Sequence, residues 1–518
     1  MGTEVELKLS IPAAEADKVR RLQWLRELSG PARCQQLVTV YFDTSKFELR
    51  ERGVAIRVRR AGRRRLQAIK ALGADGRAPF GRYEWEQEIT GDTPDLKLAH
   101  GTALEPLATK KLRRRLKPIF ETVIERTTFP IHSEKADLEL ALDRGHIRVH
   151  GSREREPISE IEIEVKRGDP VEIAKLAKRL ARSLSVTYGP RSKAERGYAL
   201  SADEAGKGVR GAAIALDPRV SAGDAFRIIG LACLDHAIAN ERATREGDAE
   251  GIHQMRVGLR RLRTAISIFK DLVHGPETEA IKTELKWLTD QLAAARDLDV
   301  LIEKQLRPLR NAAPIGAAAA VLEQDLDARR AAELAKAKAA VESERYRSGG
   351  LRTALWLAEG SWLGRDDPAR AALRERPAAQ LAAETLGART KKMLKKARRV
   401  GKLDARARHR LRIGVKKLRY ACEFFAGLFP GPKQSARRER FCKALRALQG
   451  LLGELNDFEV HKDMAAQIAR PRKDAHAQAR KALAMGFITG REQKQLESCV
   501  AAIDKTVVRL AKLPGFWK

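Results

Sequence analysis

Aromatic residues are scarce in this 518-residue sequence, where Phe, Trp and Tyr together make up 5% of the chain. Proteins that bind single-stranded nucleic acid stack the bases on aromatic side chains, so the scarcity argues against that class. Binding to the backbone of a duplex needs no aromatic residue and stays open as an alternative. The sequence also lacks any apolar run near the roughly 20 residues that a membrane-spanning helix requires, so we expect no membrane span.

Cysteine is sparse too, and the five cysteines are scattered without the spacing of a metal site or of a disulfide framework. We therefore expect buried thiols in a reducing compartment. The N-terminal stretch MGTEVELKLS has no basic segment followed by an apolar run, so no secretory signal is visible. Together these absences predict a cytoplasmic protein.

Acidic residues are the minority charge: 68 Asp and Glu stand against 101 Lys and Arg, for a formal net charge of +33. Such an excess predicts a polyanionic partner, and nucleic acid, an anionic membrane surface and inorganic phosphate chains all qualify. The hydrophobic fraction of 43% is typical of a folded protein. A chain of this length is expected to fold as two or more domains.

The two halves of the chain differ in their hydrophobic periodicity. Up to about residue 200, period-two alternation predicts strands at 38–44, 54–60, 82–89, 138–143 and 158–166, with short helical patterns around 13–28, 104–118 and 171–184. A turn-rich stretch follows, and beyond it the chain is rich in Ala, Leu, Arg and Lys with helical periodicity. We expect an α+β domain with an antiparallel β-barrel over 1–202, a linker over 203–222 and an all-α domain over 223–515. Ala-rich tracts near 316–345 and 369–400 predict long basic helices.

The stretch EVELK near the N-terminus places Glu4, Glu6 and Lys8 on one face of a strand. Two carboxylates about 4 Å apart repel by roughly 1 kcal/mol in water and about 4 kcal/mol at an effective dielectric constant near 20. A pair inside a pocket therefore calls for a cation, whereas a pair on a solvated face does not.

Similar one-sided charge recurs in other predicted strands. Arg57 and Arg59 share one face of their strand, and runs of three alternating glutamates occupy 84–88 and 160–164. Each of these charged faces could be the solvent-exposed face of a half-exposed sheet. Closing the sheet into a barrel would instead turn these charges inward and form a tunnel with acidic and basic walls. Such a tunnel suits a phosphate chain with a divalent metal, because Arg and Lys bind phosphate oxygens and carboxylates bind hard cations.

An ordered series of short motifs runs through the first 200 residues: EVELK (4–8), YFDT (41–44), IRVR (56–59), AIK (68–70), RYEWE (82–86), ER (125–126), EIEIE (160–164) and SKAERGY (192–198). This series resembles the CYTH, or triphosphate tunnel metalloenzyme, superfamily, whose members include triphosphatases, thiamine triphosphatases and adenylyl cyclases. The resemblance implies an antiparallel tunnel barrel that uses Mg²⁺ or Mn²⁺. It implies metal binding by Glu4, Glu6, Glu162 and Glu164. It implies phosphate binding by Lys8, Arg57, Arg59, Lys70, Arg126 and Lys193, with Glu4, Glu6 and Lys8 closest to the chemistry.

One helical sequence pattern occurs twice in the second half, at 252–269 and 408–425, and the two copies align without a gap. The first copy carries His253, Arg256, Arg260 and Arg263, and the second carries His409, Arg412, Lys416 and Arg419. At about 100° per residue, each set falls within an arc of roughly 80°. Apolar residues lie on the opposite side of each predicted helix. A second matched segment follows each copy, with Asp297 and Asp457 at equivalent places, where they could orient the basic side chains.

This duplication predicts two similar helical bundles, at about 223–345 and 380–515. A basic face alone would serve solubility, but solubility does not require histidine in register with three cations in both copies. The paired segments resemble the CHAD domain, a histidine-bearing helical domain associated with polyphosphate binding. The resemblance implies that both sets of basic residues bind polyphosphate. In the second copy Lys replaces Arg at 416 and 417, which keeps the charge but loses the bidentate fork.

The leading hypothesis from the sequence is a metal-dependent inorganic triphosphatase that cleaves tripolyphosphate to pyrophosphate and phosphate. Its helical domain would bind long-chain polyphosphate and could localise the enzyme to polyphosphate granules. Two alternatives stay open: a hydrolase of an organic triphosphate such as thiamine triphosphate, and a non-catalytic protein that binds or targets polyphosphate. An organic substrate would call for an aromatic contact, for which Tyr41 and Trp85 are candidates.

Overall fold

The computed structural model describes residues 2–71, 81–364, 367–470 and 474–518, and within these it leaves aside the side chains of residues 2–4, 71 and 81–83. The chain divides into two compact units, each assembled from more than one stretch of sequence. Unit 1 consists of Met1–Val209, Ile238–Gly251 and Val341–Gly360. Unit 2 consists of Arg210–Ala237, Ile252–Ala340 and Ser361–Lys518. The units therefore do not follow two consecutive halves of the chain, because two helical segments from its second half join the strand-rich unit.

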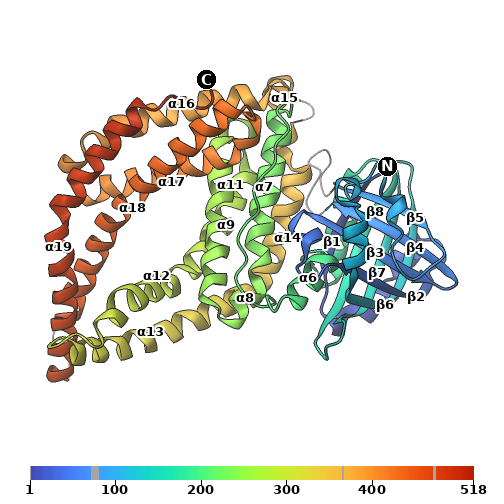
Figure 1. Cartoon of the computed structure of the whole chain (residues 1–518), viewed down its shortest axis with the longest axis horizontal. Helices are drawn as coiled ribbons and strands as arrows, with labels where there is room; N and C mark the ends of the chain where they lie inside the picture. The colour runs from blue at the N-terminus through green and yellow to red at the C-terminus, as the bar shows by residue number, and fades with distance from the viewer. Residues whose placement is uncertain (1, 72–80, 365–366, 471–473) are drawn as a thin grey trace. The chain divides into compact units, whose positions relative to one another are not determined.

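Unit 1 is built on an antiparallel sheet of nine strands, drawn in blue and cyan in Figure 1. The strands are β1 (Gly2–Ser10), β2 (Arg33–Asp43), β3 (Val54–Ala61), β4 (Arg64–Ala71), β5 (Gly81–Glu88), β6 (Lys117–His132), β7 (Ala136–Val149), β8 (Arg155–Gly168) and β9 (Thr187–Tyr188). Their order is β5-β4-β3-β2-β6-β7-β8-β1-β9, and β5 also pairs with β1. That additional pairing joins the two sides of the sheet, so strands β1 to β8 close into a barrel, as the sequence predicted.

The alternating sequences fold with their apolar faces outward, against helices and loops. Leu7 and Leu9 on β1 and Ile161 and Ile163 on β8 are fully buried. Another cluster packs Ile56 and its neighbours on β3 and β4 against the short helices between 96 and 115. Since side chains alternate along a strand, the polar residues between them face the inside of the barrel.

Short helices connect and cover the strands of unit 1: η1 (Ala13–Glu15), α1 (Ala16–Arg21), α2 (Gln23–Leu28), α3 (Glu48–Glu51), η2 (Leu96–Ala99), η3 (Glu105–Leu107), α4 (Lys110–Arg115), α5 (Val171–Ser183), α6 (Lys193–Ser201), α8 (Glu241–Glu246) and α14 (Glu344–Glu359). The helical patterns predicted near 13–28, 104–118 and 171–184 are all present. The alternation read from the sequence missed β4 and the long strand β6.

Helix α6 closes one end of the barrel interior. Its first residue follows a capping box in which Ser192 and Glu195 bond each other's backbone N–H groups. Gly197 lies against the ring of Phe120 on β6, where an added Cβ would come within 2.1 Å of a ring carbon. Glycine therefore lets α6 pack directly on the strand, and the cap places Lys193 at the first position of the helix, toward the interior.

Unit 2 is helical. Its elements are α7 (Ala222–Ala239), α9 (Ala249–Ile268), α10 (Lys270–Val273), α11 (Pro276–Gln291), α12 (Ala293–Leu301), η4 (Ile302–Leu306), η5 (Arg307–Leu309), α13 (Gly316–Glu342), η6 (Ser361–Leu363), α15 (Pro368–Glu375), α16 (Ala378–Ala397), η7 (Val400–Lys402), α17 (Ala405–Phe424), η8 (Ala426–Leu428), α18 (Pro432–Ile468) and α19 (Ala475–Lys512), with one end each of α7, α9 and α13 counted in unit 1. The Ala-rich tracts form α13, α15 and α16, which confirms the predicted helices. Across the described ranges, no helix has the length and hydropathy needed to cross a bilayer.

The duplicated patterns form α9 and α17. Their apolar stripes are buried as predicted: Met255, Leu259, Leu262, Ile266 and Phe269 in the first copy, and Leu411, Val415, Leu418, Cys422 and Phe425 in the second. The two helices also meet through side chains. Arg261 of α9 lies over the ring of Phe424 at 5.6 Å, and the rings of Phe269 and Phe425 are 6.1 Å apart. Burial of both stripes leaves the basic faces of α9 and α17 for another role.

Candidate functional site

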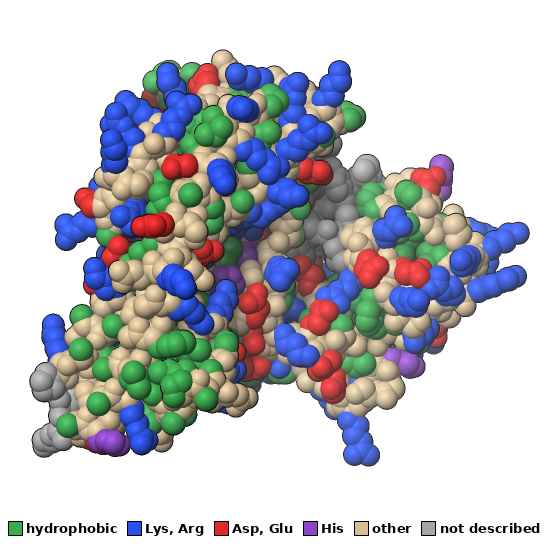
Figure 2. Space-filling model, turned by 60° about the vertical axis from the view of Figure 1, so that its left-hand side comes forward, with side chains coloured by type: hydrophobic (Ala, Val, Ile, Leu, Met, Phe, Trp, Pro, Cys, Tyr) green, Lys and Arg blue, Asp and Glu red, His purple; other side chains and the backbone are tan. Residues whose placement is uncertain are grey.

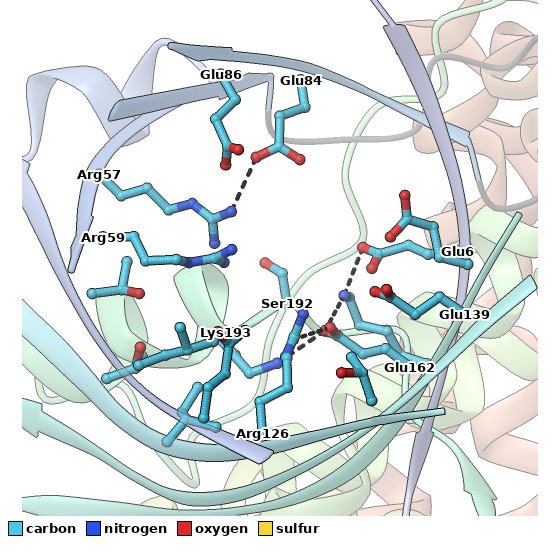
Figure 3. Close-up of a pocket in the computed structure, with 18 of the residues that line it drawn as sticks. Glu6, Arg57, Arg59, Glu84, Glu86, Arg126, Glu139, Glu162, Ser192 and Lys193 are labelled. Carbon is cyan, nitrogen blue, oxygen red and sulfur yellow. Dashed lines mark hydrogen bonds and ion pairs between the residues drawn. The ribbon is translucent and has the colours of Figure 1, made fainter. Parts of the chain in front are cut away.

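A cavity of about 1120 Å³ occupies the inside of the barrel. Figure 3 shows charged side chains pointing into it from opposite walls. The charged residues that line it are the acids Glu6, Glu84, Glu86, Glu139, Glu162 and Glu164 and the bases Lys8, Arg33, Arg57, Arg59, Lys70, Arg126, Lys166 and Lys193. We refer to this cavity as the lumen.

Three glutamates form a row across one wall of the lumen. Glu6 on β1 lies opposite Glu164 on β8, and Glu164 in turn lies opposite Glu139 on β7. Directly opposed residues in an antiparallel ladder have Cβ atoms roughly 5 Å apart, and like charges at that separation destabilise the sheet. Lys8 lies 2.6 Å from Glu6, and the ammonium of Lys166 lies 2.7 Å from Glu164 and 3.6 Å from Glu139. Lys166 is half exposed, so solvent weakens its attraction to these acids, and a cation inside the lumen would stabilise the row further.

The next rows along the same strands hold a buried ion-pair network. Lys193 contacts Asp143 at 2.7 Å, Glu162 at 2.9 Å and also Glu160. Arg126 contacts Asp143 at 2.6 Å and Glu162 at 2.5 Å. Burial would raise the pKa of Glu162, but Lys193, Lys8 and Arg126 outweigh burial and hold that pKa well below its usual range. Burial would likewise lower the pKa of Lys193, and the three carboxylates raise it instead. These groups are therefore charged and paired at neutral pH.

Two groups of acids could hold a divalent cation, and their partners distinguish them. Asp143, Glu160 and Glu162 have carboxylate oxygens within 4.8 Å of one another. Both oxygens of Asp143 already accept hydrogen bonds from Arg126, and the ammonium of Lys193 lies among all three acids. A metal ion there would have to displace these cations. The row of Glu6, Glu139 and Glu164 fits a hard cation better, because all three acids line the open lumen, whereas Asp143 and Glu160 do not.

The opposite wall of the lumen is basic. Arg57 and Arg59 lie side by side on β3 (Figure 3). Arg57 donates to Glu84 at 3.0 Å, and Lys70 lies 2.7 Å from the other oxygen of Glu84. Arg59 makes no ion pair among the described residues. Repulsion from Arg57, burial and repulsion from Arg126 lower the pKa of Arg59 to about 10, with Tyr41 and Glu86 opposing them. An arginine stays charged at neutral pH even so, and an anion would relieve the repulsion.

The structure places nearly all of the sequence-predicted barrel residues in this lumen: Glu6, Lys8, Arg57, Arg59, Lys70, Arg126, Glu162, Glu164 and Lys193. Glu4 belongs to β1, where it lies opposite Arg82, but its side chain is outside the described residues. The sequence reading missed Glu139 and Asp143 as site residues. The alternation of LELALD, which predicted a strand, also puts both acids on one face and could have revealed them.

The aromatic candidates for contact with an organic substrate have other partners. Tyr41 lines the lumen, but its ring stacks on Phe120 at 4.5 Å and is nearly buried. Trp85 packs against the outer hydrophobic cluster of β3 and β4. Among the described residues of the lumen wall, neither ring presents an open face for a base or a thiazolium.

A second charged site lies in unit 2, where the basic faces of α9 and α17 converge. Arg256 and Arg260 of α9 and Arg412 of α17 all act on Lys416 of α17, as does Asp457 of α18. We call these four basic residues the cationic cluster. Burial, then Arg412 and Arg260, lower the pKa of Lys416 to about 7, with Asp457 opposing and Arg256 adding to the decrease. The duplicated helices thus bring residues about 155 positions apart in sequence into one site.

Residues of the second matched segments support the cationic cluster and its neighbours. Arg256 lies 3.2 Å from Asp297 and donates to the carbonyl of Ala293 at 2.9 Å. His409 lies 2.6 Å from the amide oxygen of Asn456. Arg419 is bound differently, by Gln449 at 2.9 Å and by Glu423. Lys and Arg side chains are spread over the visible face of the helices in Figure 2, and histidines are visible in a hollow among them.

Two domain families match the chain. Residues 2–198 match the CYTH domain, and residues 229–466 match the CHAD domain. The first match covers the barrel strands and α6, and the second covers both duplicated helices.

Individual proteins are also similar to the chain. An inorganic triphosphatase from Haemophilus influenzae is 28% identical over 170 residues, which are 32% of this chain and 47% of the relative. The match therefore spans about half the length of that protein. The crystal structure of the CHAD domain from the plant Ricinus communis is 33% identical, with a TM-score of 0.50, and the match covers 59% of this chain and 97% of that one. PptA from Streptomyces chartreusis is 22% identical, with a TM-score of 0.42, over 55% of this chain and 99% of that one.

Proposed function

The chain belongs to the CHAD domain family and carries a CYTH domain before it, and from this premise we propose that it is a divalent-metal-dependent inorganic triphosphatase. Its substrate would be tripolyphosphate, cleaved to pyrophosphate and phosphate. The helical domain would bind longer inorganic polyphosphate. In this proposal, the domain of residues 1–202 hydrolyses tripolyphosphate and the domain of residues 223–515 binds polyphosphate.

The observation that carries this proposal is the separation of charge inside one closed lumen. A row of glutamates on β1, β7 and β8 faces arginines and a lysine on β3 and β4. The basic wall suits the phosphate oxygens, since guanidinium groups bind them through paired N–H donors. A receptor for anions alone would gain nothing from the facing row of carboxylates. The arrangement therefore favours catalysis over binding without turnover.

The residues of the chain would divide the chemistry among them. Arg57, Arg59 and Lys70 would hold and orient the phosphate chain and neutralise the charge that develops on the leaving pyrophosphate. The ion-pair network of Asp143, Lys193 and Arg126 would keep the floor of the lumen rigid. Lys8, between Glu6 and Glu162 at 2.6 Å from each, would place a positive charge beside the reacting phosphate.

Glu6, Glu139 and Glu164 are the residues of the row that would hold Mg²⁺ or Mn²⁺, and we propose Glu4 of the same strand as a further ligand. Glu162, which the resemblance also implied as a ligand, is paired with Lys8, Arg126 and Lys193, and would join only by exchanging one of them. Such an ion, when bound, neutralises phosphate charge and lowers the pKa of a coordinated water. The remaining work falls to the protein, whose barrel holds the substrate away from bulk solvent and aligns its chain between the two walls.

A non-catalytic polyphosphate-binding protein and a hydrolase of an organic triphosphate are the competing functions. The contacts of Tyr41 and Trp85 argue against a hydrolase of an organic triphosphate, because both rings are engaged in packing. The first would bind phosphate chains in both domains without releasing phosphate. A cytoplasmic location, and association with polyphosphate granules, would follow from the substrate we propose.

The proposal is tested by phosphate release from tripolyphosphate, ATP and thiamine triphosphate with Mg²⁺ or Mn²⁺. We expect tripolyphosphate to be the best substrate, and the double variant Glu4→Gln/Glu6→Gln to lose at least about 100-fold in rate. Glu154→Gln, an exposed acid outside the lumen, is the matched control. A double variant as active as the parent would refute the catalytic assignment, and background release by the parent would favour the binding protein.

A further inference from the structure

The cationic cluster contains one member that can lose its charge. Arg256, Arg260 and Arg412 carry guanidinium groups, which stay protonated at any physiological pH. Lys416 carries an ammonium group, which can release a proton when its surroundings disfavour charge. The first copy of the duplicated helix has Arg260 at the position of Lys416. The two copies therefore differ in the one property that matters for titration.

The surroundings of Lys416 are crowded with positive charge. Arg412 lies one helical turn away on α17, and Arg256 and Arg260 of α9 are close enough to repel it. The Nε atoms of these three arginines are buried without a hydrogen-bond partner among the described residues, and Lys416 itself is only partly exposed. Asp457 on α18 opposes the repulsion of Lys416, while Asp297 on α12 is engaged with Arg256. From α16, Arg389 acts on the neighbouring Lys417, together with Arg263. Lys416 is also largely removed from solvent, which disfavours its charged form further.

Within the cationic cluster, loss of a proton from Lys416 costs less free energy than loss of a proton from any of the three arginines. Without a ligand, loss of one proton from Lys416 removes three like-charge repulsions at once. A phosphate chain adds negative charge close to all four groups and reverses this preference. Resting on the polyphosphate-binding role proposed above, we propose that Lys416 is a proton-linked contact, which takes up a proton when a phosphate chain binds to the cationic cluster.

This inference predicts how affinity depends on pH. Since burial and the neighbouring arginines lower the pKa of Lys416 to about 7, the free protein holds this proton weakly at pH 8. Binding at pH 8 should then take up roughly one proton per bound chain. Linkage of one proton lowers the affinity by at most about tenfold for each pH unit above 7. Binding to the helical domain would strengthen on mild acidification.

The test is calorimetric titration of the full-length protein with long-chain polyphosphate at pH 8, in pairs of buffers that differ in ionisation heat. Long chains are used because their few terminal phosphates, which also titrate near neutral pH, contribute little. The parent should take up close to one proton and Lys416→Arg close to none, because arginine is already charged. Lys417→Arg is the matched control on the same helix and should retain most of the uptake.

A second variant, Lys416→Gln, separates loss of the proton from loss of a contact. It should bind like the parent at pH 9 and lack the increase in affinity that the parent gains toward pH 6. Equal proton uptake by the parent and Lys416→Arg would overturn the proton linkage and leave the polyphosphate-binding role intact. Absence of binding by the parent at every pH from 6 to 9 would overturn the polyphosphate-binding role itself, and the linkage with it.

Discussion

Glu6 on β1 lies directly opposite Glu164 on β8, and both carboxylates line the same lumen. Such a pair would ordinarily be avoided in a sheet, since opposed like charges destabilise it. Glu139 on β7 extends the row to three acids. The most direct explanation is that this row of glutamates binds a cation.

Mg²⁺ or Mn²⁺ should stabilise the barrel through this row. A ligand present at 100 times its dissociation constant stabilises the folded state by about 2.7 kcal/mol, so the melting temperature should rise with metal and fall on chelation. The double variant Glu139→Gln/Glu164→Gln should lose most of this response. Differential scanning calorimetry of unit 1 unfolding measures it, with Glu154→Gln as the control. If the double variant responds to metal as the parent does, the cation lies elsewhere.

Arg59 should destabilise the folded protein in the absence of ligand, and it should be required for tight binding of tripolyphosphate. Replacement by Gln removes the repulsion from Arg57 and Arg126 that lowers the pKa of Arg59. We expect Arg59→Gln to melt at the same temperature as the parent or higher, and to lose the further stabilisation that tripolyphosphate gives the parent. Its KM for tripolyphosphate should rise by about tenfold or more, the loss of one charged hydrogen-bond donor. A lower melting temperature without ligand would show that Arg59 has a structural role instead.

Asp143 should be needed for the stability of the barrel rather than for contact with substrate. Its carboxylate is fully buried between Arg126 and Lys193, so Asp143→Asn leaves two buried cations short of a partner. Removal of one partner from a buried ion pair costs about 3–5 kcal/mol. Hydrogen exchange measured by mass spectrometry should show faster opening of β7 and β8. Glu88→Gln, which removes the exposed partner of Arg64, should change exchange little.

The contacts of α9 and α17 predict unequal roles for the basic residues proposed to bind polyphosphate. Arg256→Gln and its counterpart Arg412→Gln should each weaken binding of long polyphosphate and reduce its salt dependence, since each removes one charge contact. Arg419→Gln should have a smaller effect, because Arg419 is not part of the cationic cluster and its guanidinium is engaged by Glu423 and Gln449. Binding isotherms at several salt concentrations measure both quantities. An equal effect at all three positions would mean that only net charge matters.

Much of the candidate site could be predicted from local sequence. Period-two alternation identified which residues share a strand face, as for Glu162 and Glu164 or for Arg57 and Arg59. The repeated helix predicted the buried stripes and basic faces of α9 and α17. These predictions succeed because side-chain direction within a strand or a helix depends only on the local backbone geometry.

The sequence was less informative where local patterns were interrupted. Strand β6 was missed, and Arg126 could be placed only by its order among the motifs. Cys34 is exposed, whereas burial was expected for all five cysteines. Glu139 and Asp143 were overlooked because their importance comes from the strands beside them. Each of these outcomes depends on neighbours far away along the chain.

The sequence by itself determined the faces of the elements, the excess of positive charge and the duplication of the basic helix. Only the tertiary structure decided that Glu6 opposes Glu164, that Arg126 and Lys193 are committed to buried acids while Arg59 is not, and that Lys416 lies among arginines of both copies. The reason is that strand register, barrel closure and helix packing join residues more than 100 positions apart. A charged group acts on whatever lies within a few ångströms, and sequence separation does not report that distance.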